Sequence, residues 1–220
     1  FSLMMMAAPC IMAQNPKREF RGAWLHVIGQ TQWQNKTPEQ QKEYINDQFD
    51  KLVDAGCNAV IFQVRPTADA LYKSELEPWS AWLTGKRGKA PSIDWDPMEY
   101  AIEEAHKRGL EFHAWLNPYR VTSNPKDLLT PDHEAKKHPE RMVKFNGQTF
   151  FDPAYQENRD FICKVVKDIV SRYDVDAIHI DDYFYPYPAN GKKFDADGVS
   201  YAKFGNGMPR NDWRRHNVDL

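Results

Sequence analysis

The chain has 220 residues, of which 41% are apolar and 27% charged, and its formal net charge is -2. This length and apolar content are enough to bury one core, and the charged content favours a soluble domain over a membrane-embedded one. Because no strong run of either sign occurs, no nucleic-acid partner and no electrostatic membrane surface are expected. Aromatic residues make up 13% and several of the seven Trp stand in polar segments, which suits a sugar ligand.

Residues 1–14 form an apolar stretch that is too short to span a bilayer but has the length of the apolar part of a secretory signal peptide. We therefore expect residues 1–13 to be the remnant of a signal peptide cleaved after Ala13. The protein is then exported to the periplasm or outer envelope. A lipid on Cys10 would be its only link to a membrane, although Ala8-Pro9 is a poor lipidation signal.

Helices and strands alternate along the chain, after a first strand expected over residues 22–27. The first helix is predicted over residues 37–56, because Thr37 and Gln40 form a capping box and a glycine ends the apolar helical pattern. A short apolar run over residues 58–65 follows at once and ends before a proline. This run predicts the second strand.

The second helix is predicted to begin at Asp96-Pro97 and to end at Gly109, and it leads into a strand over residues 111–117. A third helix is predicted to begin near Asp152-Pro153 and to lead into a strand over residues 177–181. Four strands separated by helices indicate parallel pairing, since parallel neighbours need a crossover connection. The predicted fold class is α/β.

Two α/β architectures share this alternation, the doubly wound sheet and the (β/α)₈ TIM barrel. Each predicted strand ends in polar or aromatic residues, and no glycine-rich phosphate turn follows the first strand, so the barrel is favoured. A complete barrel takes about 250 residues. Residues 14–220 are therefore expected to form the N-terminal half of one barrel domain. In its longest loop, residues 66–95, Trp79 and Trp82 are either a sugar-stacking wall or the core of the loop.

The tip of the last predicted strand carries two adjacent carboxylates, Asp181 and Asp182. If Ile178 and Ile180 pack outward against helices, strand alternation turns His179 and Asp181 inward, and Asp182 enters the following loop. Asp181 and Asp182 are therefore the candidate catalytic residues. The alternative is a pair of solvated turn carboxylates.

The same alternation brings polar and aromatic side chains of the other strands to the same rim. A carboxylate, an arginine that holds it ionised, amides for hydroxyl groups and an aromatic floor suit the cleavage of a glycosidic bond. Arg65 and Asn117 are expected at this rim rather than in the core, although each could simply end its strand before a proline. Each histidine could equally be a satisfied core residue. The expected substrate-binding residues are Trp24, His26, Gln63, Arg65, Trp115, Asn117, Tyr119, Arg120, His179 and Tyr183.

Four stretches at the strand tips, in this order, carry a resemblance to a known family: residues 20–24, 62–66, 113–120 and 178–186. Together they resemble the glycosyl-hydrolase-like family ten of bacterial envelope proteins. The resemblance implies a (β/α)₈ barrel and a glycan substrate, including peptidoglycan strands stripped of their peptides. His179-Ile180-Asp181 is similar to the fourth strand of amylase-type barrels, where a basic residue stands two before the nucleophile, although that residue is usually Arg. The resemblance favours Asp181 over Asp182 and implies that the general acid lies on a fifth strand, after Leu220.

The leading hypothesis is a glycoside hydrolase that acts on envelope glycan, with the glycan as its only expected partner. The alternative is a non-catalytic glycan-binding protein on the same barrel, because a fold alone does not decide function. A third option is a hydrolase that holds a metal at Asp181 and Asp182, but the sequence lacks a convincing cluster of metal ligands. No metal and no cofactor are therefore expected.

Produced alone, the 220 residues are expected to self-associate or to be poorly soluble, because an open half-barrel leaves a strand edge and an apolar flank uncovered. Size-exclusion chromatography with light scattering measures this. A monodisperse monomer that melts cooperatively would contradict the half-barrel interpretation, whereas a longer chain with eight strand-helix units should be monodisperse.

Overall fold

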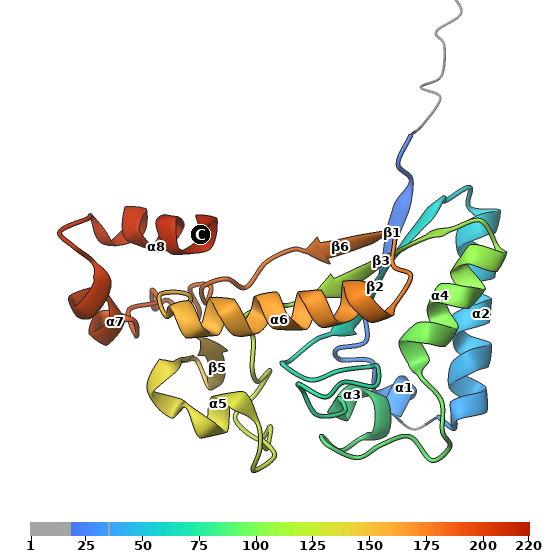
Figure 1. Cartoon of the computed structure of the whole chain (residues 1–220), viewed down its shortest axis with the longest axis horizontal. Helices are drawn as coiled ribbons and strands as arrows, with labels where there is room; N and C mark the ends of the chain where they lie inside the picture. Colours follow the sequence, from blue (N-terminus) through green and yellow to red (C-terminus); the bar gives the residue numbers. More distant parts are fainter. Residues whose placement is uncertain (1–18, 35) are drawn as a thin grey trace, which may run out of the picture.

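The computed structural model describes residues 19–34 and 36–220, so the expected signal peptide remnant and Cys10 lie outside the described residues. Its centre is a four-stranded parallel sheet in the order β1-β2-β3-β6 (Figure 1). The strands are β1 (Gly22–Leu25), β2 (Ala59–Arg65), β3 (Glu111–Leu116) and β6 (Ala177–Ile180). The predicted α/β class with a parallel sheet is confirmed.

Three long helices connect these strands: α2 (Pro38–Asp54), α4 (Pro97–Lys107) and α6 (Gln156–Arg172). The capping box at Thr37 is present, because its side chain accepts from the backbone N–H of Gln40 and the Gln40 side chain accepts in return. The start expected for the third helix at Asp152-Pro153 is wrong. Asp152 instead accepts a hydrogen bond from the backbone N–H of Ala154, which turns the chain before α6 begins.

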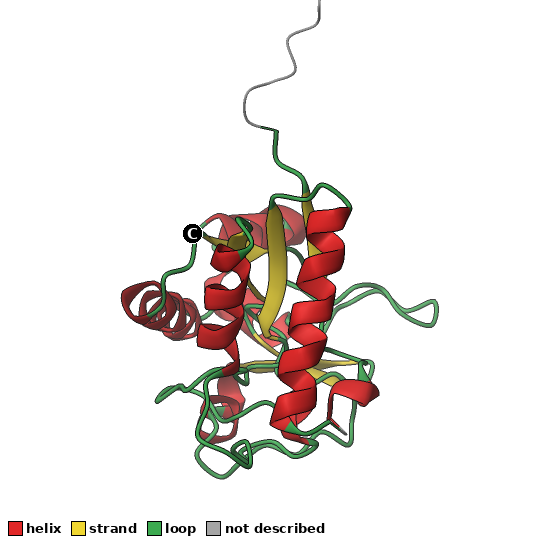
Figure 2. Cartoon of the chain, turned by 90° about the vertical axis from the view of Figure 1, so that its right-hand side faces the viewer, coloured by secondary structure: helices red, strands yellow, loops and turns green. Residues whose placement is uncertain are grey.

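The apolar core lies between the sheet and these helices, and Figure 2 shows α2 and α4 side by side along the strands. Alternate strand residues point to this face, and Ile178 of β6 packs against the same core. A fully buried side chain of this size contributes about 1.5–3 kcal/mol. The buried strand and helix residues include Val60, Phe62, Val64, Phe112, Ala114, Leu116, Ile45, Phe49, Met98, Ile102, Val165 and Ile169.

The opposite face of the sheet is lined by aromatic and polar side chains. Trp24 of β1 donates a hydrogen bond from Nε1 to Nε2 of His179 in β6, at 3.1 Å. In a flat sheet the first and fourth strands would lie about 14 Å apart. The sheet is therefore curved toward this face. Trp24 is 60% exposed, so the concave side is open to solvent at this point.

An antiparallel hairpin, β4 (Met142–Phe145) and β5 (Gln148–Phe151), stands in the connection between β3 and α6 and was not predicted. Its turn is Asn146-Gly147, with φ of 46° and 75°, the conformation that Asn-Gly favours in two-residue hairpins. Val143 and Phe150 pack on one face of the hairpin, against the loop that follows β6. The hairpin thus connects the segments that follow two neighbouring strand tips.

The remaining elements are short. They are α1 (Thr31–Gln34), α3 (Ala81–Thr84), α5 (Glu134–Lys137), the 3-10 helix η1 (Pro139–Arg141), α7 (Gly198–Phe204) and α8 (Arg210–Asp219). The carboxylate of Asp197 pairs with Arg210 and Arg214, which fixes α8 against the start of α7. Trp79 and Trp82 pack partly buried against the main core, so the loop-core interpretation fits them better than an open wall. Over the described part of the chain, no helix combines the length and the apolar character needed to cross a membrane.

Asp96 has a larger structural role than a helix cap alone. It accepts the backbone N–H groups of Met98 and Glu99 at the start of α4, and its second oxygen accepts from the Lys73 N–H and the Tyr173 hydroxyl, at 2.8 and 2.6 Å. Asp96→Ala should therefore lower the unfolding free energy by about 3 kcal/mol, because it leaves several donors unsatisfied.

The comparison variant is Thr37→Ala, which removes only a cap and should cost about 1 kcal/mol. Urea unfolding of the complete protein measures both values. Equal losses in the two variants would show that Asp96 acts only as a cap.

Candidate active site

Asn117, directly after β3, is the centre of a hydrogen-bond network at the carboxyl ends of the strands. Its Oδ1 accepts from Nε2 of Gln63 and from Nη2 of Arg120, both at 2.7 Å. Its Nδ2 donates to Oδ1 of Asp181 at 2.9 Å. Because two donors fix the amide oxygen, the amide nitrogen must face Asp181. Asn117 itself is buried, with 1% of its surface exposed.

Gln63 extends this network to the first strand. Its Oε1 accepts the backbone N–H groups of Val27 and Ile28, at 3.0 and 3.1 Å, just beyond the end of β1. Groups from all four strand ends are thus joined in one chain of hydrogen bonds that ends on Asp181. Gln63 is fully buried, so it supports the site from beneath.

The rim position expected for both Asn117 and Arg65 is wrong, because Asn117 is 1% exposed and the Arg65 side chain 0%. Its guanidinium forms a two-point pair with Glu77, at 2.6 and 2.5 Å, and Nη1 donates to the carbonyl oxygens of Asn117 and Pro118. Burial by itself lowers the pKa of Arg65, but the Glu77 carboxylate outweighs it, so the pKa is raised. Arg65 therefore holds the backbone at Asn117 and lies below the surface that a substrate could reach.

The two aspartates differ in environment. Asp181 is exposed at the end of β6, whereas Asp182 is partly buried in the following loop. Burial raises the pKa of Asp182, the charge of Asp181 raises it further, and Arg120 opposes both. The pair therefore offers one accessible carboxylate beside a carboxyl group that is more easily protonated than an ordinary aspartate.

Tyr183 follows this pair in a strained backbone conformation, with φ of 62°. A bulky residue adopts such a value only when its surroundings hold it, and strain of this kind is concentrated at functional sites. The Arg120 guanidinium lies 4.6 Å from the centre of the Tyr183 ring, and Phe150 of the hairpin stacks with the ring at 6.4 Å. Tyr187 meets the Tyr183 ring edge-on at 5.3 Å and is 56% exposed.

Three of the predicted binding residues, Trp24, Trp115 and His179, lie on the concave side of the sheet. His179 contacts Trp24 and lies edge-on to the Trp115 ring at 6.4 Å. Since Nε2 of His179 accepts from Trp24, this nitrogen carries no proton. Burial lowers the pKa of His179, against the opposing charge of Asp181.

Trp24, Trp115 and His179 thus form a separate group on the concave face, and two further predicted binding residues also lie apart from the network. His26 is exposed and hydrogen-bonds Gln30, and Tyr119 is 7% exposed and packs on Phe184. The site thus brings together Asp181, Asp182, Asn117, Arg120 and Tyr183, with Gln63 and Arg65 beneath them.

Sequence reasoning missed Glu77, Tyr187 and Phe150, which complete the site. No local signal marks Glu77, because it stands in a loop without periodic pattern, twelve residues from Arg65. The Asn146-Gly147 turn could have revealed the hairpin that carries Phe150.

His133 supports the loop after β2. Ala68 in this loop has φ of 49°, and its carbonyl oxygen lies 2.9 Å from Nε2 of His133. The other ring nitrogen of His133 accepts the backbone N–H of Ala135 and so caps α5. Among the described residues, no group of three or more His, Cys, Asp or Glu side chains is arranged to hold a metal ion.

The family model described as glycosyl hydrolase-like 10 matches residues 19–220. The chain belongs to the glycosyl hydrolase-like 10 family. The resemblance stated from the strand-tip stretches is therefore confirmed. Glycosyl hydrolase YngK of Bacillus subtilis is 44% identical over 222 residues, which are 97% of this chain and 43% of that protein. Glycosyl hydrolase DigH of Escherichia coli is 34% identical over 231 residues, which are 96% of this chain and 52% of that protein.

The chain thus spans about half the length of the curated relatives that it matches. Two solved structures share the fold of this family member. Alpha-L-fucosidase isoenzyme 2 from Paenibacillus thiaminolyticus has a TM-score of 0.54 at 14% identity, over 92% of this chain and 29% of that one. A Flavobacterium johnsoniae chitobiase has a TM-score of 0.53 at 11% identity, with the same coverage. At these identities the likeness shows the mixed α/β fold with a parallel sheet.

His133 makes the stability of this family member sensitive to acid. Burial, and then the nearby Arg87 charge, lower the pKa of His133 from 6.5 to about 4. As the pH falls, His133 is therefore protonated at a higher pH in the unfolded chain than in the folded protein. The stabilisation is complete above pH 6.5 and is lost as the pH falls toward 4, by up to about 3 kcal/mol.

Urea unfolding at pH 7 and pH 4.5 measures this loss in the complete protein. His133→Gln keeps a donor for the Ala68 carbonyl but cannot titrate, so its unfolding free energy should fall less between the two pH values. The same fall in both proteins would place the acid sensitivity elsewhere.

Proposed function

We propose that the protein is a glycoside hydrolase of the cell envelope that acts on peptide-stripped peptidoglycan strands. The single observation that carries this proposal is the exposed carboxylate of Asp181, held by Asn117 at the carboxyl end of a parallel sheet. Active sites of barrel enzymes lie at this end of the strands. Membership of a glycosyl hydrolase-like family supports the reaction class.

In this proposal Asp181 acts on the anomeric carbon, as a nucleophile or as the charge that stabilises an oxocarbenium-like transition state. Its orientation is set before substrate arrives, because the Asn117 amide is fixed by Gln63 and Arg120. A preorganised carboxylate needs no reorientation during the reaction, which is where such groups gain their effect.

Asp182 is the natural partner for a sugar hydroxyl near this carbon. Its carboxyl oxygens can accept a hydrogen bond from such a hydroxyl, and burial together with the charge of Asp181 raises its pKa. The amylase-type pattern that Asp181 resembles has its general acid on the next strand, and we assign the acid to that strand of a closed (β/α)₈ barrel. The curvature of the sheet, on which Trp24 and His179 meet, supports such closure.

Aromatic side chains at the open side support a glycan substrate. Trp24 and Tyr187 are 60% and 56% exposed, on the concave face and beside the Asp pair respectively. Large exposed aromatic rings with a polar group suit contacts with the apolar faces of sugars. An exported protein, as proposed here, would meet such strands in the envelope.

Asp181→Asn keeps the shape of the side chain and removes its charge. It should reduce the release of soluble saccharides from peptide-free glycan strands by at least about 10³-fold, since a neutral amide replaces neither a nucleophile nor a stabilising charge. Binding of the strands in a pull-down should persist. Asp182→Asn should be milder, within about 10²-fold.

The matched control is Asp54→Asn, an exposed aspartate at the end of α2, which should leave saccharide release unchanged. A dead Asp182 variant beside an active Asp181 variant would reverse the two roles. Strand binding by the wild-type protein without any saccharide release would favour the non-catalytic glycan-binding function instead.

A further inference from the structure

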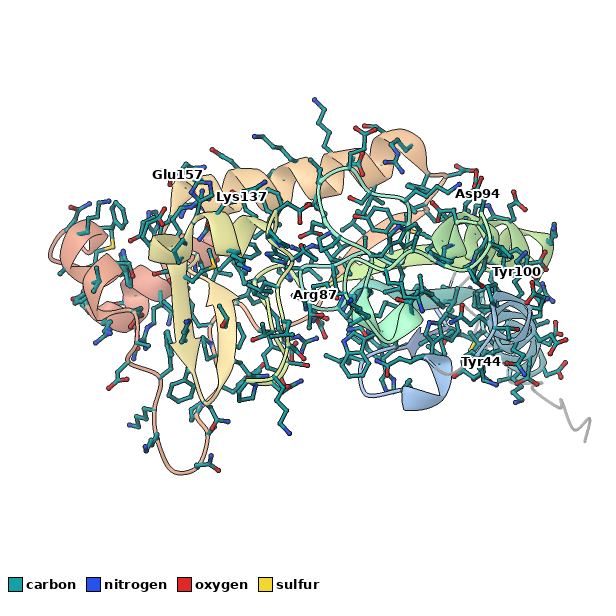
Figure 3. The ribbon with its side chains drawn as sticks, turned by 90° about the horizontal axis from the view of Figure 1, so that it is seen from below. Tyr44, Arg87, Asp94, Tyr100, Lys137 and Glu157 are labelled. Carbon is teal, nitrogen blue, oxygen red and sulfur yellow. The ribbon has the colours of Figure 1, made fainter. Side chains whose placement is uncertain are left out.

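A separate pocket lies beside the long loop that follows β2. It has a volume of about 420 Å³, within the range of small-molecule sites, and lies between the α3 segment and residues 126–131. Figure 3 shows the labelled Arg87 near the middle of the molecule, between this segment and the hairpin. The lining residues are Ala81, Gly85, Lys86, Arg87, Lys126, Asp127, Leu128, Leu129, Thr130 and Pro131.

Arg87 is the unusual residue of this pocket, because it is buried and incompletely paired. Its side chain is 5% exposed, and its Nη2 donates to the carbonyl oxygen of Val121 at 3.2 Å. Asp69 lies 3.4 Å from its Nε, yet Nε and Nη1 have no hydrogen-bond partner among the described residues. Buried polar groups are nearly always paired, so Arg87 contributes to the wall of this pocket a buried positive charge that its neighbours satisfy only in part.

The pocket carries excess positive charge. Lys86 and Lys126 are exposed at its edge. Among the described residues, the ion pair at this pocket is the one between Arg87 and Asp69. Asp127, the one acidic lining residue among those described, already accepts from the Ser123 N–H and hydroxyl and from Asn124. A positive pocket with unpaired donors attracts an anion.

The pocket also has surfaces that suit a sugar ring. Leu129 and Pro131 supply apolar contacts. A groove of about 610 Å³ continues from the same Leu128 and Leu129, and Lys136 and Lys144 line it. A polymer of sugars could therefore run from the pocket along this groove.

We propose that this pocket binds a carboxylate-bearing sugar unit of the glycan, with Arg87, Lys86 and Lys126 facing the carboxylate. This inference rests on the proposed function for the identity of the polymer. The pocket is joined to the candidate site through the chain itself, because Arg87 holds Val121 while Arg120 holds Asn117. The pocket would thus bind one sugar unit of a strand while Asp181 acts on another unit of the same strand.

The test measures strand binding in the complete Asp181→Asn protein, so that no turnover occurs. The probes are peptide-free glycan strands with intact carboxylates and the same strands with methyl-esterified carboxylates. The intact strands should bind at least fivefold more tightly, and the preference should shrink in high salt, because exposed charges are screened. The double variant Lys86→Gln/Lys126→Gln should lose about fivefold in affinity for the intact strands alone.

The control is Lys164→Gln, an exposed lysine on α6 outside the pocket, which should bind as the parent protein does. Arg87→Gln should abolish the preference for intact strands; if its pairing with Asp69 proves essential for folding, the double lysine variant decides alone. Equal binding of intact and esterified strands, or a double variant that matches the Lys164 control, overturns the proposal. Saccharide release by the wild-type protein is scored separately, so a failed hydrolase function is distinguishable from a failed pocket.

Discussion

The arrangement at the strand ends depends on one amide group. Asn117 has a single acceptor oxygen and a single donor nitrogen, and the protein commits the oxygen to two donors, Gln63 and Arg120. The nitrogen is then left with one direction, toward Asp181. Groups from all four strand ends meet in this network, so the position of the carboxylate follows from the register of the sheet.

Beneath this amide lies a buried ion pair that positions the backbone more than it stabilises the fold. Burying Arg65 with Glu77 removes two charges from water, and such pairs seldom stabilise a fold more than apolar residues would. The remaining donors of Arg65 hold the carbonyl oxygens of Asn117 and Pro118. The long loop after β2, which supplies Glu77, is therefore bound to the segment after β3, and the pair fixes the backbone from which the amide projects.

Local features such as helix caps and strand alternation could be predicted from the sequence, but the extent to which each side chain is buried could not. The caps at Thr37 and Asp96 were predicted because each depends on residues within one turn. Alternation placed Ile178 against the helices, but Ile180, expected to pack beside it, is 40% exposed. Alternation tells which face a side chain takes but not how far a loop covers it, so Arg65 was placed at the rim. Its partner could not be found, because no periodic pattern links a strand residue to a loop carboxylate.

The hairpin forms a wall shared by two loops, so a change in specificity that alters one loop also affects the other. One face of it packs against the loop after β6, which carries Tyr183, and the other borders the lysine-lined groove through Lys144 and Thr149. The two loops therefore cannot be exchanged one at a time between relatives without mismatching a shared wall. A chimera that grafts residues 120–151 together with residues 181–194 keeps that wall intact, so the two segments form one structural unit although α6 and β6 stand between them in the chain.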